Sequence, residues 1–499
     1  MNTLVKRFDK KHYLFALFIV IVYAVAAFNL VGYYHPDEHY QILEFAQFKM
    51  GKLPAADMPW EFNYAMRSSF QPWIVIGIRD LTGITNPYTL TLILRLLTAG
   101  LAIYSIIRFT RTVRSEWKTP IYRLFLGLSF LLWFLPYLNV RFSSETWAGL
   151  FFLLACAVVV KTQKTSVTAA LLVGILLGLS FWCRFQVATM ILGLLLWLII
   201  IKKERLKMIL ALISSGILVL VAGVVVDYFF YGYWTFSFWN YYNMNIVHDM
   251  ASGFGTMDGF TFLIRTVEAM TIPVGIIVVG CFIFLLLYKP RSFVLWCMIP
   301  LIVVHMAIPH KEVRFLFPIA NFIPYIIATG VSTMKDQVFK IWPKDRQRQV
   351  FPVISTIVLV VFALLNVACL AIAVSAPPQY GRIEMTKYFH DRYPDEKIQL
   401  YGLRRSNPFK PYTVLNQSFY NMKNISFNTI NNYDSLNVVA PLPSQSFFMI
   451  RSEDLNNQDV REYLAKENMK LAKASRPAWV TNILQQFDVA NRDYLLYLK

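Results

Sequence analysis

Long apolar runs recur along this chain from residue 14 to residue 376, and they constrain its fold more than any other feature. Many of them approach the roughly 20 residues that cross a bilayer as a helix. Only 15% of the residues are charged, whereas about one quarter are charged in soluble domains. The sequence therefore predicts an all-α polytopic membrane protein. We expect about eleven transmembrane helices, at approximately residues 14–31, 88–107, 121–138, 147–160, 167–182, 187–201, 208–226, 271–288, 293–308, 315–333 and 351–376.

Basic residues are concentrated in alternate connections between these runs. The segments are "KRFDKK", "RFTRTVRSEWK", "KTQK", "KKERLK", "KPR" and "KDQVFKIWPKDRQR", and they carry most of the net charge of +19. Because positively charged loops stay on the cytoplasmic side, the excess indicates topology and not a nucleic-acid partner. We expect the N-terminus inside and, with eleven spans, the C-terminus outside.

Two long segments between spans are expected on the outer face. In the first, residues 32–86, the stretch "EHYQILEFAQFKMG" places Ile42, Phe45, Ala46 and Lys49 on one helical face. This pattern predicts an amphipathic helix along the bilayer surface. The second, residues 227 to about 270, contains "DYFFYGYWTFSFWNYYNMN", and aromatic side chains at this density favour the membrane interface.

The tail, residues 377–499, has an ordinary composition and predicts a small α/β domain on the outer face. "KIQLYGL", "QSFFMI" and "YLLYLK" are typical of strands, and "NQDVREYLAKEN" is typical of a helix opened by polar residues. The predicted organisation is thus a transmembrane catalytic domain, residues 1–376, followed by this domain.

Five polar clusters fall on the outer ends of the expected spans. They are "HPDEH" (35–39), "RFSSE" (141–145), "CRFQ" (183–186), "DYFFYG" (227–232) and "HKEVRF" (310–315). Ionisable groups at membrane depth are costly and usually functional. Clusters that share one face can build one site, and this is the main functional prediction from the residues alone.

Each cluster also has a simpler explanation. His35 could cap a helix whose first position is Pro36, which would put Asp37 and Glu38 in the first turn, where carboxylates suit the helix dipole. A metal site is less favoured here, since consecutive helical residues do not face one ion. The arginines of "RFSSE" and "CRFQ" could snorkel at span ends.

"HKEVRF" is harder to explain as a plain connection. Three cations and one anion lie within five residues between two apolar runs. Lysine and arginine are the residues that hold phosphate, arginine by bidentate hydrogen bonds. These parts suit transfer from a lipid-linked phosphate donor, in which a carboxylate deprotonates an acceptor hydroxyl and cations stabilise the leaving phosphate.

Three ordered motifs carry a family resemblance. "HPDEHYQ" after the first span, "VVVDYFFYGYWTFSFWNYYNMN" in the middle and "HKEVRFLFPI" near the end resemble glycosyltransferase family 22. These are lipid-phosphate-mannose-dependent mannosyltransferases of the GT-C fold, among them the enzymes of GPI-anchor assembly. The resemblance covers roughly residues 14–376. It suggests a bacterial member, and it is not carried into the tail.

The resemblance implies roles for individual residues. The family's acidic pair maps onto Asp37, as catalytic base, and Glu38, as its acidic partner. The His-Lys-Glu-x-Arg-Phe motif is implied to act near the donor phosphate. The middle motif commonly reads Asp-Ser-x-Phe-Tyr-Gly, and here Tyr228 replaces the serine after Asp227. That departure weakens any inference about the acceptor.

The predicted function is therefore inverting transfer of a sugar, expected to be mannose, from a polyprenyl-phosphate donor to a glycan or glycolipid acceptor. Arg184, Lys311 and Arg314 are expected to contact phosphate, and Glu145 and Asp227 to orient sugar hydroxyls or the cations. No metal or other cofactor and no nucleic acid is required. The predicted substrate-binding residues are His39, Gln41, Glu145, Arg184, Gln186, Asp227, His310, Lys311, Glu312 and Arg314.

Two alternatives remain open from the sequence. The first is a GT-C transferase for another sugar, such as arabinose, glucose or aminoarabinose. The second is a transporter or flippase for a lipid-linked saccharide, although transporters place polar groups near the bilayer midplane. We expect a multi-pass protein of the bacterial inner membrane with a periplasmic site, or alternatively of the endoplasmic reticulum with a lumenal site.

Overall fold

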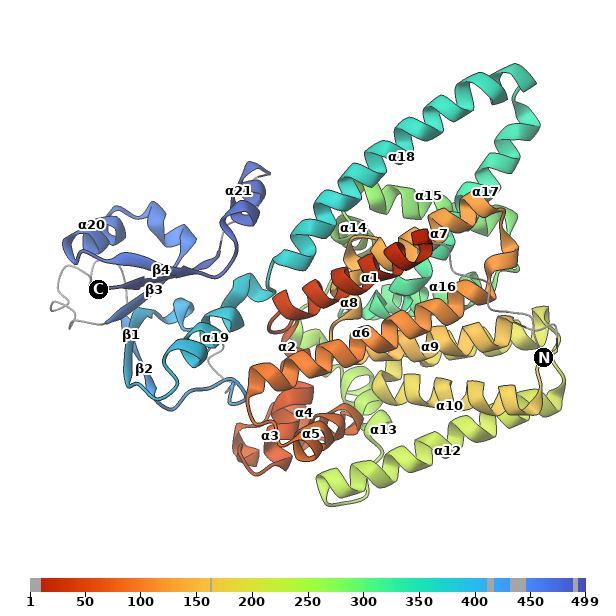
Figure 1. Ribbon diagram of the computed structural model, residues 1–499. Coiled ribbons are helices and arrows are strands. Elements are labelled where there is room, and N and C mark those ends of the chain that lie inside the picture. The colour runs from red at the N-terminus through yellow and green to blue at the C-terminus, as the bar shows by residue number, and fades with distance from the viewer. Residues whose placement is uncertain (1–9, 162–163, 411–416, 431–445, 488–491) are drawn as a thin grey trace. The chain divides into compact units, whose positions relative to one another are not determined.

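The computed structural model describes residues 10–161, 164–410, 417–430, 446–487 and 492–499 (Figure 1). The first basic segment of the sequence lies mostly outside these residues. By their contacts the residues form two compact units. Unit 1 comprises residues 1–23, 64–71 and 95–371, and unit 2 comprises residues 24–63, 72–94 and 372–499. The first outer segment is thus divided, and most of it belongs to the same unit as the tail.

The secondary structure of unit 1 consists of helices in its described residues. Four helices contribute residues to both units: α1 (Lys10–Asn29), α5 (Phe70–Thr82), α6 (Pro87–Thr112) and α18 (Lys344–Ser375). The other helices of unit 1 are α7 (Thr119–Leu131), α8 (Phe134–Asn139), α9 (Ser144–Val160), α10 (Val167–Cys183), α11 (Ala188–Leu196), α12 (Leu206–Tyr231), α13 (Ser237–Tyr242), α14 (Gly259–Ala269), α15 (Ile272–Tyr288), α16 (Phe293–Ala307) and α17 (Ile323–Ile341). A 3₁₀ segment, η8 (Val313–Phe322), leads into α17.

Helices α9, α10 and α12 lie side by side in unit 1, as Figure 1 shows in yellow to green. The α10–α12 contact requires glycine, because a Cβ atom on Gly174 would lie 2.0 Å from the carbonyl oxygen of Leu212. Backbones that approach this closely gain dispersion contacts that larger side chains would prevent. A glycine also allows α9 to pack closely against η8, as described below.

Five described helices are long and apolar enough to cross a membrane, and the bent pair α14–α15 would make a sixth. Shorter apolar helices of 10–17 residues occupy the remaining predicted runs. These findings support an integral multi-pass membrane protein. The number of eleven spans stays a prediction, because the shorter helices do not by themselves reach across a bilayer.

Unit 2 contains the predicted C-terminal sheet. Its five described strands are β1 (Ile398–Leu403), β2 (Ile425–Ile430), β3 (Phe447–Arg451), β4 (Lys470–Ala474) and β5 (Tyr494–Leu498), in the order β2-β1-β3-β5-β4. Strand β1 pairs in parallel with β2 and β3, whereas β5 pairs antiparallel with β3 and β4. The three predicted strands and the predicted helix, α20 (Gln458–Lys466), are confirmed.

Alternating side chains of the sheet feed two apolar cores. Phe447 and Met449 of β3 pack with Phe389 of α19 (Arg382–Arg392), while Phe448 and Ile450 pack with residues of α20. This alternation follows from the two-residue period of a strand. Helix α21 (Ala478–Gln486) follows β4.

The predicted helix in the first outer segment is confirmed, but its prediction as a surface helix with one exposed face is wrong. The segment folds as α2 (Pro36–Glu38), a π-helical stretch (His39–Glu44) and α3 (Phe45–Lys49), followed after a loop by α4 (Trp60–Asn63). Every residue from 39 to 47 is buried, including the polar residues outside the predicted apolar face. The charged side chain of Glu44 tolerates burial because its carboxylate accepts hydrogen bonds from the N–H and the hydroxyl of Ser418, which is distant in the sequence.

Candidate functional site

Glu145 is held at the N-terminus of α9. Ser143 caps this helix by accepting a hydrogen bond from the backbone N–H of Thr146, which leaves Glu145 in the first turn. Gly149 lies one turn later, and a Cβ atom there would lie 2.7 Å from the carbonyl oxygen of Pro318. The helix face that carries Glu145 therefore packs directly on η8.

Two arginines converge on Glu145. Nη1 of Arg184 and Nη1 of Arg314 each lie 3.1 Å from the same carboxylate oxygen, Oε1. Both guanidinium groups also stack over the ring of Phe315, at 5.4 and 5.2 Å from its centroid. The three charged residues are at most 6% exposed. We call Glu145, Arg184, Arg314 and Phe315 the arginine cluster.

Glu312 provides a second anion for Arg314. Nε and Nη2 of Arg314 donate to the two oxygens of Glu312 in a bidentate arrangement, the geometry that fixes a guanidinium most firmly. Nε2 of His310 lies 3.0 Å from Oε1 of Glu312. The hydrogen bond to Glu312 raises the pKa of His310 above its ordinary value. The motif thus forms a linked chain of charges.

Lys311 has a different environment from its neighbours. Its ammonium donates to the backbone carbonyl oxygens of Met257, Ile308 and Pro309, and the residue is 7% exposed. These three acceptors match the three donors of an ammonium group. In this conformation Lys311 joins two loops, so phosphate contact by this side chain would require it to exchange partners.

Gln186 extends the arginine cluster toward the aromatic segment after α12. Its side-chain oxygen accepts from Nε of Arg184, and its amide nitrogen donates to the hydroxyl of Tyr241 at 2.8 Å. The guanidinium of Arg67 lies over the ring of Tyr241, 5.1 Å from the centroid. Gln186 is therefore positioned to orient Arg184.

Asp227 connects three segments of unit 1. One carboxylate oxygen accepts from the backbone N–H and the hydroxyl of Ser69, at 2.9 and 2.6 Å, and the other accepts from the hydroxyl of Ser237 at 2.7 Å. Helix α12 ends four residues later, where Gly232 adopts a left-handed conformation (φ +86°). Both carboxylate oxygens of Asp227 accept hydrogen bonds, and the residue is 3% exposed. In this structure Asp227 therefore holds the three segments together.

The acidic pair of "HPDEH" lies in unit 2. The predicted helix start is confirmed: His35 is the N-cap and its Nδ1 accepts from the N–H of Asp37, with Pro36 in the first turn. The carboxylate of Glu38 accepts from the N–H of Tyr34. The side chain of Asp37 is 25% exposed. This carboxylate is thus held by a defined helix start and reaches solvent.

His39 and Gln41 are buried behind the acidic pair. Nε2 of His39 lies 2.7 Å from Oε1 of Glu44, and both side chains are fully buried. The imidazole stacks between the rings of Tyr33 and Tyr420. The amide of Gln41 donates to both oxygens of Glu61, at 3.2 and 3.0 Å. These contacts favour a role for His39 and Gln41 in positioning the acidic pair over direct contact with substrate.

Two residues of the site were missed from the sequence. Tyr241 was hidden within a long aromatic stretch. His305, 1% exposed on α16, lies with its ring 5.5 Å from that of Phe315, and its Nε2 has no hydrogen-bond partner among the described residues. A histidine inside an otherwise apolar run was the signal that could have identified it.

The arginine cluster has the chemistry of an anion site. Nη2 of Arg184 makes no hydrogen bond within the described residues, so it has donors for a further acceptor. Within the described residues the carboxylate beside Arg184 is that of Glu145, which also pairs with Arg314, so the charge of Arg184 is only partly neutralised. Buried arginine forks recognise phosphate and carboxylate more strongly than exposed ones do, since water does not screen them.

Residues 13–400 match the sequence model of the Alg9-like mannosyltransferase family. Among curated relatives, GPI alpha-1,2-mannosyltransferase 3 of Danio rerio is 24% identical over 336 residues, which are 65% of this chain and 60% of the relative. GPI mannosyltransferase 3 of Candida albicans is 24% identical over 387 residues, which are 74% of this chain and 70% of the relative. The chain thus spans about 60% of the length of the Danio rerio relative that it matches.

The fold is also similar to solved structures. ArnT from Cupriavidus metallidurans, crystallised with undecaprenyl phosphate, superposes with a TM-score of 0.54 at 12% identity, covering 98% of this chain and 97% of ArnT. The apo form gives a TM-score of 0.50 at 13% identity, covering 97% of each chain. At this identity the likeness shows the fold alone, which is the predicted GT-C fold.

Proposed function

This chain belongs to the Alg9-like mannosyltransferase family, and we propose that it transfers mannose from a polyprenyl-phosphate donor to a hydroxyl of a glycan or glycolipid. The observation that carries this proposal is the convergence of Arg184 and Arg314 on one oxygen of Glu145. Such a buried pair of guanidinium groups suits the phosphate of a lipid-linked sugar.

The proposed reaction is a direct displacement at the anomeric carbon. The acceptor oxygen forms a bond to this carbon while the bond from the carbon to the phosphate oxygen breaks, and the electron pair leaves with polyprenyl phosphate. The proton of the acceptor hydroxyl passes to the carboxylate of Asp37, which acts as general base. A single displacement inverts the anomeric centre, so a β-linked donor yields an α-linked product. Glu38 supports Asp37 as a second acid.

Arg184 and Arg314 are proposed to stabilise the charge that develops on the leaving phosphate. Glu145 and Glu312 keep the two guanidinium groups oriented before the donor arrives, so that little reorganisation is needed during the reaction. Gln186 and His310 complete this arrangement through Arg184 and Glu312 respectively. Arg184 and Arg314 supply the positive charge, and the proposal requires no metal.

The proposed location follows the charge pattern. Positively charged connections on the cytoplasmic side would place the arginine cluster on the opposite face, which is the periplasmic face in a bacterial inner membrane and the lumenal face in the endoplasmic reticulum. A lipid carrier then explains why phosphate-binding residues lie at the ends of apolar helices.

A panel of radiolabelled donors tests the proposal. The purified chain in proteoliposomes is supplied with polyprenyl-phosphate mannose, arabinose, aminoarabinose or glucose, together with an acceptor glycolipid extract. We expect transfer from the mannose donor. Transfer of another sugar in preference would replace mannose in the proposal. Movement of intact donor from one leaflet of the bilayer to the other, without sugar transfer, would favour a flippase.

Replacing Arg314 tests the phosphate role. Arg314→Lys retains a cation but removes the bidentate fork, and we expect it to raise KM for the donor more than KM for the acceptor. Arg265→Lys is the matched control, because the side chain of Arg265 is 61% exposed and forms a surface ion pair with Glu268 three residues away. Equal changes in both KM values for Arg314→Lys would contradict the phosphate role.

A further inference from the structure

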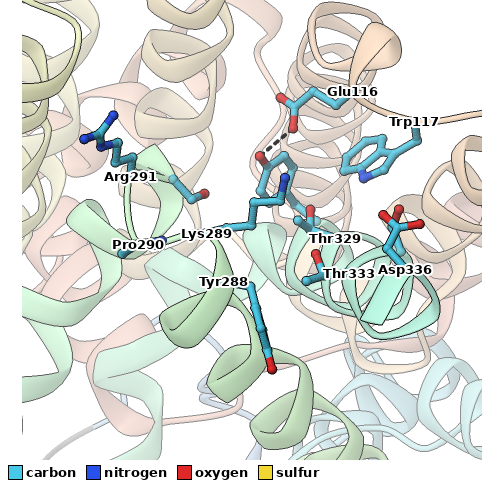
Figure 2. Close-up of a pocket in the computed structure, with 12 residues that line it drawn as sticks. Glu116, Trp117, Tyr288, Lys289, Pro290, Arg291, Thr329, Thr333 and Asp336 are labelled. Atoms are coloured by element: carbon cyan, nitrogen blue, oxygen red, sulfur yellow. Dashed lines mark hydrogen bonds between the residues drawn. The ribbon is translucent and has the colours of Figure 1, made fainter. Parts of the chain in front are cut away.

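A pocket of about 530 Å³ lies in unit 1, lined by residues of the segment before α7, of the loop between α15 and α16, and of α17 (Figure 2). Ser292, which lines the pocket, precedes α16, whereas His310 follows its other end. Likewise, α17 begins after η8, which carries Arg314, and reaches the pocket near Asp336. The volume falls within the roughly 300–1,000 Å³ typical of ligand sites. Nothing in the proposed transfer reaction uses this pocket.

One side of the pocket suits a phosphate. Figure 2 shows the side chain of Lys289 extending toward Glu116, and Lys289 makes no ion pair within the described residues. The hydroxyls of Ser292 and Thr329 lie in the same pocket, near the hydroxyl of Tyr325. An ammonium and hydroxyl groups in one pocket are the groups that hold a phosphate oxygen.

Glu116 also lines the pocket, and its carboxylate already has a hydrogen-bond donor. Its carboxylate accepts a hydrogen bond from the hydroxyl of Tyr325 at 2.6 Å. Although Glu116 as a residue remains accessible, protein atoms surround the carboxyl, and this desolvation raises its pKa above the ordinary value. The hydrogen bond from Tyr325 and the charge of Lys289 act on this pKa in the opposite direction.

Another side of the pocket suits a primary ammonium. Trp117 and Asp336 lie together on the side away from Arg291 (Figure 2). Asp336 is exposed and forms no ion pair in the described part of the chain. A carboxylate next to an indole face attracts an ammonium by charge, hydrogen bonding and cation–π interaction.

Apolar surface adjoins the pocket. Tyr288, which lines it, is 47% exposed, and the residues directly before it on α15, Leu286 and Leu287, are 39% and 68% exposed. Tryptophan and tyrosine at a polar pocket beside exposed leucines are typical of the headgroup level of a bilayer. A ligand whose polar group enters the pocket could therefore keep acyl chains on α15.

We propose that this pocket binds a phosphoethanolamine group, presented as the headgroup of a phospholipid, with the phosphate at Lys289, Ser292 and Thr329 and the ammonium at Asp336 and Trp117. The pairing of opposite charges on two sides of one pocket favours a zwitterion over a simple anion. The proposal stands independently of the transferase reaction.

Binding of short-chain lipids to the purified full chain tests this proposal. Native mass spectrometry and thermal stabilisation are used to compare dihexanoyl phosphatidylethanolamine with the phosphatidylglycerol and phosphatidylcholine of the same chain length. We expect phosphatidylethanolamine to bind at least about tenfold more tightly than either, because phosphatidylglycerol lacks the ammonium and phosphatidylcholine cannot donate hydrogen bonds to Asp336. Equal binding of the three lipids would overturn the proposal.

Two variants test the ammonium side and the phosphate side of the pocket separately. Asp336→Asn should remove the preference for phosphatidylethanolamine over phosphatidylglycerol, whereas Lys289→Gln should weaken both. Glu268→Gln, at an exposed position on α14, should change neither. Unaltered binding in both pocket variants, each with the wild-type thermal midpoint in the absence of lipid, would contradict the assignment.

Soluble O-phosphoethanolamine distinguishes the source of the group. If it displaces the bound lipid at equal concentration, the pocket recognises the headgroup alone. If a large excess is required, the acyl chains on α15 contribute and the ligand is a membrane lipid. Both results support a phosphoethanolamine site. Failure of both the lipid and O-phosphoethanolamine to bind would contradict it.

Discussion

Glu145 and Arg314, 169 residues apart in the sequence, are joined by an ion pair of 3.1 Å in which both side chains are buried. Arg184 shares the same carboxylate oxygen. Arg184 of "CRFQ" and Arg314 of "HKEVRF" therefore both contact one oxygen, Oε1, of Glu145 in "RFSSE". Removing that atom's charge should affect both arginines at once.

Glu145→Gln should destabilise the fold and impair donor use. Losing one partner of a buried ion pair leaves uncompensated charge, which costs about 3 kcal/mol. We expect the free energy of unfolding in mixed micelles to fall by about this amount. Glu268→Gln breaks an exposed pair on α14 and should cost about 0.5 kcal/mol or less. Equal losses in the two variants would mean that Glu145 contributes no more than a surface charge.

Gly149→Ala should displace α9 from η8 and thereby separate Glu145 from Arg314. The added methyl group would lie 2.7 Å from the carbonyl oxygen of Pro318, and backbone cannot yield as a flexible side chain can. We expect donor KM to rise several-fold. Gly127→Ala on α7 is the matched control, since nothing lies within 4 Å of its Cβ position. Activity that is unchanged in Gly149→Ala would show that this close approach does not position the cluster.

His310 should stabilise the protein at low pH. The hydrogen bond to Glu312 raises the pKa of His310, so its contribution is fully present below the ordinary pKa of about 6.5 and is lost as pH rises through the raised value. The thermal midpoint of wild type should exceed that of His310→Gln by more at about pH 5.5 than at about pH 8.5. A difference that does not change with pH would indicate that His310 is not protonated against Glu312.

Glu44→Gln should loosen the segment around residue 418 within unit 2. The carboxylate of Glu44 accepts hydrogen bonds from the N–H and hydroxyl of Ser418 and from the N–H of Phe419. Each hydrogen bond to a charged group contributes about 1.5 to 3 kcal/mol. We expect faster amide exchange at Ser418 and Phe419. Glu462→Gln, on the exposed face of α20, should leave that exchange unchanged.

Much of the fold follows from local sequence patterns. Apolar runs predict the helices, and short segments rich in apolar residues predict β1, β3 and β5. Strand β1 alternates buried and less buried side chains over most of its length, whereas β3 and β5 bury consecutive ones. Strands β2 and β4 escaped prediction, since "ISFNTI" and "KLAKA" lack a continuous buried face. The burial of Glu44 could not be foreseen, because its partners lie 374 and 375 residues away.

Part of the site was also predictable from local sequence patterns. The clusters "RFSSE", "CRFQ" and "HKEVRF" were expected on one face, and Glu145, Arg184 and Arg314 do meet. Their individual partners were not predictable, because residue type does not specify which side chain pairs with which. Asp227 and Lys311 satisfy their polar groups inside the protein, a result that only three-dimensional contacts reveal. The roles assigned to Asp37 and Glu38 stay predictions.

The most direct test of the proposed function is the rate of mannose transfer by Asp37→Asn in proteoliposomes supplied with polyprenyl-phosphate mannose. Loss of the general base should lower the rate by about 10²- to 10⁴-fold while the thermal midpoint stays near the wild-type value. Asp57→Asn, in the same outer segment, is the control and should retain full activity. Transfer by Asp37→Asn at the wild-type rate would contradict the assignment of Asp37 as the base.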